Sequence, residues 1–330
     1  MHGRISITLC LLAAGGMIAG RASAQQAPAG AELVAMDTAP TASDGVLRQS
    51  LDDAWWTGPI IANSPVTLPP GHGYIESYLF DVKTKERDSF NSLTFMQYGV
   101  AEGLTLGIIP TAGFNRVDNA LDSSGVGIGD TTLMATWRLS KYEPGNWVPT
   151  TALSIQQSLP TGKYDRLGSR PADGLGSGAY TTTIGFFGQA WFWMPNGRIL
   201  RGRINLQRSF SSDARVEDVS VYGTPEGFRG RAKPGASFFF VNSWEYSLSR
   251  SWVLAVDLGY RHDNRTRVAG TDGAEPVRFA TKPADTFIVA PAVEYSWTAK
   301  HGVIFGVRYI PANGPVPESV TPVVALSIFM

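Results

Sequence analysis

The sequence predicts an all-β protein, a transmembrane antiparallel up-and-down β-barrel of about twelve strands. Three observations lead to this fold class. Polar and apolar residues alternate along nearly every segment after residue 72, aromatic residues fall near the ends of these segments, and short connections alternate with long ones. The composition agrees, because only 17% of the residues are charged, against about 25% in ordinary soluble proteins.

The charge and hydropathy of the chain exclude several other classes of protein. Its 28 Lys and Arg residues balance 28 Asp and Glu residues, so no excess positive charge is available to neutralise nucleic-acid phosphates. The mean hydropathy of −0.04 argues against a bundle of membrane-spanning helices. The 9 Trp, 11 Tyr and 16 Phe residues argue against disorder.

Residues 1–24 are predicted to be a cleaved signal peptide, which would export the chain towards the bacterial outer membrane. Arg4 belongs to the polar start, an apolar stretch covers 5–20, and Ala22-Ser23-Ala24 places small residues where a signal peptidase cleaves. The alternative is a membrane anchor, but the apolar stretch is shorter than the roughly 20 residues that a spanning helix needs. Since Cys10 is the only cysteine, the exported chain would contain no disulfide.

Residues 25–72 are predicted to form a periplasmic leader rich in Ala and Pro. The prolines favour an extended backbone over a helix. Trp55 and Trp56 need burial, and we expect them to pack at the mouth of the barrel or against its periplasmic rim. The sequence leaves three positions open for this leader: inside the lumen, across the periplasmic mouth, or without fixed structure.

The barrel itself is predicted over residues 73–330. Alternation is clear in the fourth segment, where Leu133 and Trp137 share one face while Thr132 and Met134 share the other. Twelve strands are expected, an even number as in bacterial outer-membrane barrels. They are 73–81, 89–99, 103–113, 128–139, 150–160, 178–194, 198–210, 235–247, 252–263, 285–297, 302–311 and 320–330.

The connections between these strands set the orientation of the barrel. If both termini are periplasmic, every short connection falls on the periplasmic side and the others are external, as in outer-membrane barrels. The short connections are 100–102, 140–149, 195–197, 248–251 and 298–301. The long or polar ones are 82–88, 114–127, 161–177, 211–234, 264–284 and 312–319.

Two rival interpretations concern the same segments. The uncharged stretch 174–197 has the length of a membrane helix, but its Gly residues and its β-branched and aromatic residues favour a strand. A soluble secreted β-sandwich is the more serious rival. A sandwich would not need an apolar stripe on the outer face of nearly every strand.

Several short motifs carry a resemblance to a known family. They are Gly127-Ile128-Gly129-Asp130, Leu159-Pro160-Thr161-Gly162-Lys163-Tyr164, Lys233-Pro234-Gly235, Tyr246-Ser247-Leu248-Ser249 and Leu258-Gly259-Tyr260. With these motifs, residues 70–330 resemble the outer-membrane family named for the MetA pathway of phenol degradation, with Tyr180 where a Trp is expected. The resemblance implies a transmembrane barrel that passes small, aromatic or apolar molecules across the outer membrane.

Polar and charged residues that alternation places inside the barrel are the candidate functional residues. They form either an internal network of ion pairs or a constriction that selects a solute by size and charge. Their mixed signs predict no strong preference for anions or cations. The candidates are Asp130, Arg138, Gln156, Arg201, Arg203, Asn205, Gln207, Glu245, Asp257, Arg261, Glu294 and Arg308.

We predict no enzymatic activity, no metal and no cofactor. After the signal segment the chain has only His72, His262 and His301, and no serine motif accompanies them. The predicted partners are outer-membrane lipid, the barrel assembly machinery and a small-molecule solute, without nucleic acid, for a monomeric protein. The alternating last strand, which ends at Phe329-Met330, suits recognition by the assembly machinery. The alternative function is a non-conducting structural or binding barrel with a plugged lumen.

Overall fold

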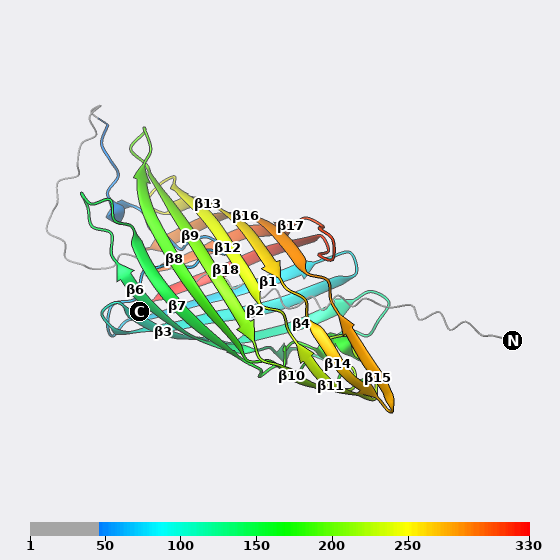
Figure 1. The fold of residues 1–330 in the computed structure, drawn as a ribbon. Helices are drawn as coiled ribbons and strands as arrows, with labels where there is room; N and C mark the ends of the chain where they lie inside the picture. The colour runs from blue at the N-terminus through cyan, green and yellow to red at the C-terminus, as the bar shows by residue number, and fades with distance from the viewer. Residues whose placement is uncertain (1–45) are drawn as a thin grey trace.

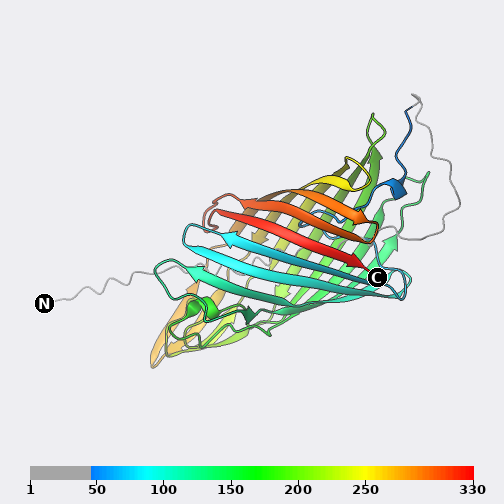
Figure 2. The same ribbon diagram turned by 180° about the vertical axis from the view of Figure 1, so that it is seen from behind.

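The computed structural model describes residues 46–330 and contains one closed antiparallel β-barrel (Figure 1, Figure 2). The predicted signal peptide, 1–24, and the leader residues 25–45 lie outside the described residues. Within residues 46–330, the structure contains no helix long and apolar enough to span a membrane. The chain enters its first strand at Gly73 and leaves the last one at Phe329.

The barrel closes because β1 pairs with β18 on one side and with β2 on the other. Each of the twelve predicted segments overlaps one strand position, so the predicted fold class is confirmed. The barrel strands are β1 (Gly73–Lys83), β2 (Arg87–Ala101), β3 (Leu104–Ile109), β4 (Thr111–Val117), β5 (Gly127–Ile128), β6 (Thr131–Ser140), β7 (Thr150–Leu159), β8 (Thr181–Trp193), β9 (Ile199–Ser211), β12 (Ser237–Ser247), β13 (Trp252–Asp263), β16 (Ala284–Thr298), β17 (His301–Ile310) and β18 (Ser319–Phe329).

Two of the twelve strand positions are interrupted. Pro110 separates β3 from β4, because a proline has no N–H to donate to the ladder. Gly129 and Asp130 separate β5 from β6, where the chain bends at the external end. The halves of these two strands still pair within the wall, β3 with β6 and β4 with β5.

The outer face of the barrel is apolar and carries aromatic residues towards both ends. Leu133, the third residue of β6, and Leu254, the third residue of β13, are 45% and 43% exposed. Trp252 packs on Tyr295 at the periplasmic end, with ring centroids 4.6 Å apart. Tyr260 packs on Phe287 at the external end. This distribution is typical of a surface that faces lipid between two interfacial aromatic belts.

The connections follow the predicted asymmetry, with one exception and one addition. The first external connection has only three residues, 84–86, because β1 and β2 extend into the predicted loop. The predicted external loops 211–234 and 264–284 contain four strands that the sequence analysis missed: β10 (Ala214–Glu217), β11 (Phe228–Lys233), β14 (Arg267–Asp272) and β15 (Glu275–Ala280). Arg and Lys at alternate positions made β11 resemble a polar loop, and the other three strands are short and contain charged residues.

These four strands form a second sheet, which we call the external sheet. Its order, β10-β11-β14-β15, repeats the order β9-β12-β13-β16 of the barrel strands to which the four are connected. The external sheet therefore prolongs one side of the barrel wall, at the end opposite to the C-terminus (Figure 1).

Candidate functional site

The lumen is occupied by residues 54–68, which we call the lumen loop. The loop enters at the periplasmic end, where Trp55 donates its backbone N–H to the carbonyl oxygen of Arg250 at 2.7 Å. It returns to that end at Leu68, whose N–H donates to Thr105 Oγ1 at 2.8 Å. Nearly all of its residues are buried. The extended, proline-containing sequence leaves its N–H groups free to bond with the wall.

Two carboxylates of the barrel wall accept these backbone N–H groups. Glu294 on β16 accepts from Thr57 and Gly58, at 2.7 Å each. Asp257 on β13 accepts from Ile61 at 2.9 Å and from Ala62 at 3.2 Å. Each carboxylate therefore satisfies two buried donors of a segment that forms no strand of its own, which fixes the depth to which the loop enters.

The tip of the lumen loop is held by two further polar side chains on β9. Asn205 accepts from the N–H of Asn63 and donates to its carbonyl oxygen at 3.0 Å. Arg203 donates from Nη1 to the carbonyl oxygen of Ala62 at 3.2 Å. These side chains provide the hydrogen bonds that a neighbouring strand would provide, so the backbone groups at the tip have partners inside the barrel.

A fully buried ion-pair cluster lies on the periplasmic side of these contacts. Glu245 on β12 accepts from Arg201 Nε at 2.7 Å and lies 3.2 Å from Arg203 Nε. The Arg201 guanidinium also lies 4.3 Å from the ring centroid of Trp56 and 5.4 Å from that of Trp191. Desolvated charges of this kind are stable only when paired, and here one carboxylate serves two cations.

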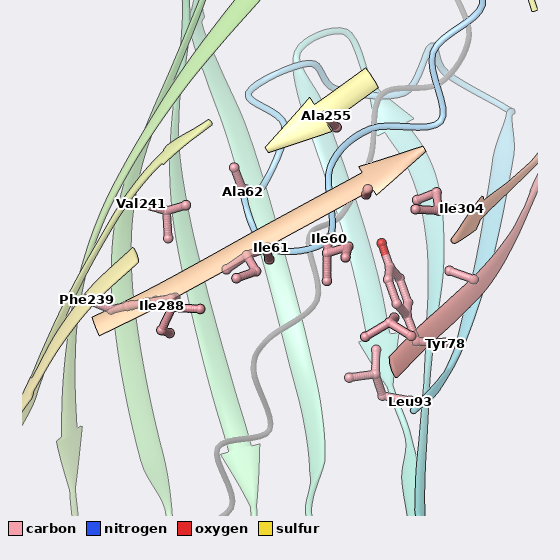
Figure 3. Close-up of a cluster of buried hydrophobic side chains, with 14 of the residues drawn as sticks. Ile60, Ile61, Ala62, Tyr78, Leu93, Phe239, Val241, Ala255, Ile288 and Ile304 are labelled. Atoms are coloured by element: carbon pink, nitrogen blue, oxygen red, sulfur yellow. The ribbon is translucent and has the colours of Figure 1, made fainter. Parts of the chain in front are cut away.

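Apolar packing completes the seat of the loop. Ile60, Ile61 and Ala62 lie in the same buried cluster as Tyr78 and Ile304 (Figure 3). Glycines on β17 provide the space for this close approach. A Cβ added at Gly302 would overlap the side chain of Thr57, and one added at Gly306 would overlap that of Ile60. Larger residues at these two positions would therefore push the loop away from the wall.

The external mouth is covered by residues 160–180, which we call the mouth loop. Its short helix η2 (Pro171–Asp173) contacts β4, where Asn115 Nδ2 donates to the carbonyl oxygen of Ala172 at 2.7 Å. Asp130 anchors the loop near its ends, accepting from the N–H of Gly162 at 3.0 Å and from Ser177 Oγ at 2.6 Å. The lumen is thus filled from the periplasmic side, and the mouth loop lies at its external end between the external sheet and β4.

The structure places nine of the twelve sequence-predicted site residues on the inner face and buries them. These are Gln156, Arg201, Arg203, Asn205, Gln207, Glu245, Asp257, Glu294 and Arg308. It brings Arg201, Arg203 and Glu245 together as an ion-pair cluster, whereas Gln156 and Arg308 lie apart from it. Asp257, Glu294 and Asn205 contact the lumen loop, a partner that the sequence analysis did not assign to them.

The other three predicted residues lie at the rims of the barrel instead of lining the lumen. Asp130 holds the mouth loop, because the backbone turns at the break between β5 and β6. Arg138 pairs with Glu102 in the periplasmic turn that follows β2. Arg261 pairs with Asp263 at the external end of β13, at 2.7 Å. Alternation identifies which side a residue faces but not its depth, and these three lie at the ends of strands.

Some inward residues were not predicted from the sequence. Glu76 on β1 is fully buried between the inward-facing Tyr74 and Tyr78. Alternation along the first strand could have identified it. The contact residues of the lumen loop had no such signal, because an irregular segment has no periodicity that could assign its residues to a face. Of the two tryptophans, Trp56 is buried just inside the barrel, and Trp55 lies under Arg250 at its periplasmic end.

The one histidine at the external rim has a carboxylate partner. His262 Nδ1 lies 2.7 Å from Asp285 Oδ1, which also accepts from the hydroxyl of Tyr260 at 2.8 Å. No serine hydroxyl is bonded to this histidine among residues 46–330. The same residues contain no cluster of three His, Cys, Asp or Glu side chains that could hold a metal ion.

Comparison with known proteins gives one family and a set of barrels. Residues 59–313 match the profile of a family described as "Putative MetA-pathway of phenol degradation". An outer membrane channel from Pseudomonas putida F1 superposes with a TM-score of 0.58 at 16% identity, covering 80% of this chain and 97% of the channel. The transport unit of the autotransporter AIDA-I from Escherichia coli gives a TM-score of 0.45 at 8% identity, covering 78% and 89%. No curated protein sequence matches the chain.

Proposed function

Because the chain belongs to the family described as "Putative MetA-pathway of phenol degradation", we propose that it is an outer-membrane channel for small molecules and that its lumen loop is the gate. The observation that carries the proposal is the way the loop is held. Residues 57–63 bond to Glu294, Asp257 and Asn205 mainly through backbone N–H groups. Such a segment can leave the lumen without breaking a strand pair of the barrel.

The lining of the lumen supports passage of a polar or amphipathic solute once the loop is displaced. Its wall combines charged residues with threonine, serine and glutamine side chains, and water and solutes would take over the hydrogen bonds that the loop now makes. The wall carries both signs of charge, which supports weak rather than strong selectivity for ions.

A small pocket beside the loop suggests which solutes bind. It is lined by Ile60 and Ile61 of the loop, by Phe80 and Val323 of the wall, and by Arg308. Apolar walls around one cationic group are suited to a small aromatic or apolar molecule with a polar or anionic substituent. We propose this solute class, and transport assays with matched aromatic acids and sugars would test it.

The second candidate function is a non-conducting barrel that serves as a structural or binding module. The observation in its favour is that both ends of the lumen are filled, by the lumen loop and by the mouth loop. Planar-bilayer recording separates the two functions. A folded barrel that never conducts, under voltage or with candidate solutes, would favour the second.

A disulfide that locks the loop tests the gate directly. Because a Cβ at position 302 would meet the side chain of Thr57, which the change to Cys shortens, the pair Thr57→Cys and Gly302→Cys is the choice for this disulfide. Export would leave no other cysteine in the chain. We expect channel openings in the reduced double variant and in the Thr57→Cys control, and none after oxidation of the double variant. Equal conductance in the oxidised and reduced forms would show that the loop is not the gate.

A further inference from the structure

The external sheet has two faces of opposite character. Ala214, Val216, Phe228, Ala232 and Val268 form a buried cluster on one face. Tyr164 and Ala179 of the mouth loop pack against this cluster, so the apolar face of the sheet is turned towards the mouth of the barrel. The other face is turned away from the mouth and is exposed.

The exposed face is strongly basic. Paired positions place Arg215 beside Arg231, and Lys233 beside Arg267, on the same side of the sheet. Arg278 on β15 shares this side, because it pairs with Ala269, which in turn pairs with Arg231. The six exposed cations of this face are Arg215, Arg229, Arg231, Lys233, Arg267 and Arg278.

One acidic residue on this face offsets few of these charges. Glu217 pairs with Arg215 at 3.0 Å and also accepts from Arg166 Nε of the mouth loop at 3.1 Å. The hydrogen bond from Arg166 holds the pKa of the Glu217 carboxyl below its ordinary value, so this carboxylate remains charged and is already paired with Arg166 and Arg215. Within the part of the chain that the structure describes, the other five cations of the face form no ion pair.

This arrangement is unfavourable for an isolated protein in water. Like charges directly opposite each other on neighbouring strands destabilise a sheet, and this face contains two such pairs. A ligand with several negative charges would relieve the repulsion and accept charge-assisted hydrogen bonds from the guanidinium groups, which suit phosphate geometry.

The position of the basic face selects the ligand. The external sheet prolongs the wall formed by β9, β12, β13 and β16, whose outer face carries exposed apolar residues such as Leu206, Leu258 and Phe287. The external sheet continues the wall beyond the external end of this apolar surface (Figure 1), and in an outer-membrane barrel this is where lipid headgroups would begin. We propose that the basic face of the external sheet binds the phosphate groups of lipopolysaccharide in the outer leaflet.

The proposal makes the external sheet an interaction surface with its own role, independent of conduction through the lumen. Binding of phosphorylated lipid would neutralise the face, hold the external sheet at the membrane surface and fix the mouth loop that packs behind it. Because the contacts are exposed ion pairs, the affinity should fall as ionic strength rises.

Charge reversal along one strand provides the test. The triple variant Arg229→Glu, Arg231→Glu, Lys233→Glu is purified in detergent and titrated with fluorescently labelled lipopolysaccharide. The matched control carries the same change of charge on periplasmic turns, as Lys141→Glu, Arg198→Glu, Lys300→Glu. We expect the β11 triple variant to bind about a hundredfold more weakly than the native protein and the control to bind normally. Lipopolysaccharide stripped of its phosphates should bind the native protein as poorly as the intact form binds the triple variant.

The proposal would be overturned by native affinity in the β11 variant, by an equal loss in the control, or by equal binding of the phosphate-free lipid. Complete displacement of the labelled lipid by millimolar inorganic phosphate would also overturn it, since that indicates a site for small anions. Folding is monitored by the shift in gel mobility on heating. If the triple variant does not fold, the neutral pair Arg231→Gln and Arg278→Gln replaces it, with an expected loss of about tenfold.

Discussion

The two sides of the lumen differ in how they hold the lumen loop. The inner faces of β9, β12, β13 and β16, which we call the charged wall, carry Arg201, Arg203, Glu245, Asp257 and Glu294. Among residues 46–330, the inner faces of β2, β3, β6, β7 and β8, which we call the neutral wall, carry no fully buried charged residue, since Arg87 and Arg138 lie at the ends of their strands. The loop makes most of its polar contacts with the charged wall. The charges therefore position a segment of the chain, in addition to any effect on a solute.

The largest effect should follow from removing the shared carboxylate of the charged wall. Glu245→Leu leaves Arg201 and Arg203 buried without their counter-charge, and we expect the free energy of unfolding to fall by about 3–5 kcal/mol. Denaturant titration in detergent, followed by tryptophan fluorescence, measures it. The matched variant on the neutral wall, Gln156→Leu, should change stability by less than about 1 kcal/mol, because its Oε1 has no partner to lose. An equal loss of stability in the two variants would show that the two walls do not differ in this respect.

The difference between the walls should be confined to the lumen. Leu254 lies outside the charged wall and Leu133 outside the neutral wall, and both are exposed on the outer face. Leu254→Arg and Leu133→Arg should each lower the free energy of unfolding in a bilayer, by up to about 2–4 kcal/mol for a side chain at mid-membrane, because each places a cation against hydrocarbon. Folding titrations into lipid vesicles measure both. A large cost at only one position would mean that only one outer surface lies at mid-membrane.

The sequence was sufficient to predict the walls but not the loop between them. Alternation with a period of two identified the inner faces and so placed residues such as Arg203 and Glu294 correctly. It could not predict that Glu294 bonds to Thr57, because a long-range contact with an irregular segment leaves no periodic pattern. The external sheet was missed for a related reason. Its alternating Arg and Lys residues gave the segment 228–233 the polarity of a solvated loop.

The third effect concerns how firmly the charged wall holds the loop. Asp257→Asn leaves one acceptor and one amide N–H₂ facing the backbone donors of Ile61 and Ala62, so one donor loses its partner. The free energy that holds the loop in the lumen should fall by about 1.5–3 kcal/mol, the usual value of a hydrogen bond to a charged group. Faster hydrogen exchange at both amides and more frequent channel openings would follow. Unchanged exchange at these amides would show that Asp257 does not hold the loop.

The smallest effect should come from the neutral wall, where a hydroxyl holds the end of the loop. Thr105→Val keeps the shape of the side chain but removes the oxygen that accepts the N–H of Leu68. A neutral hydrogen bond contributes about 0.5–1.5 kcal/mol, so the loop should remain seated, with faster exchange at Leu68 and native exchange at Ile61. If the channel of the Thr105→Val variant opened as often as that of Asp257→Asn, the expected order of the two effects would be wrong. The two ends of the loop would then leave the lumen together, and the contrast between the walls would not decide how the gate opens.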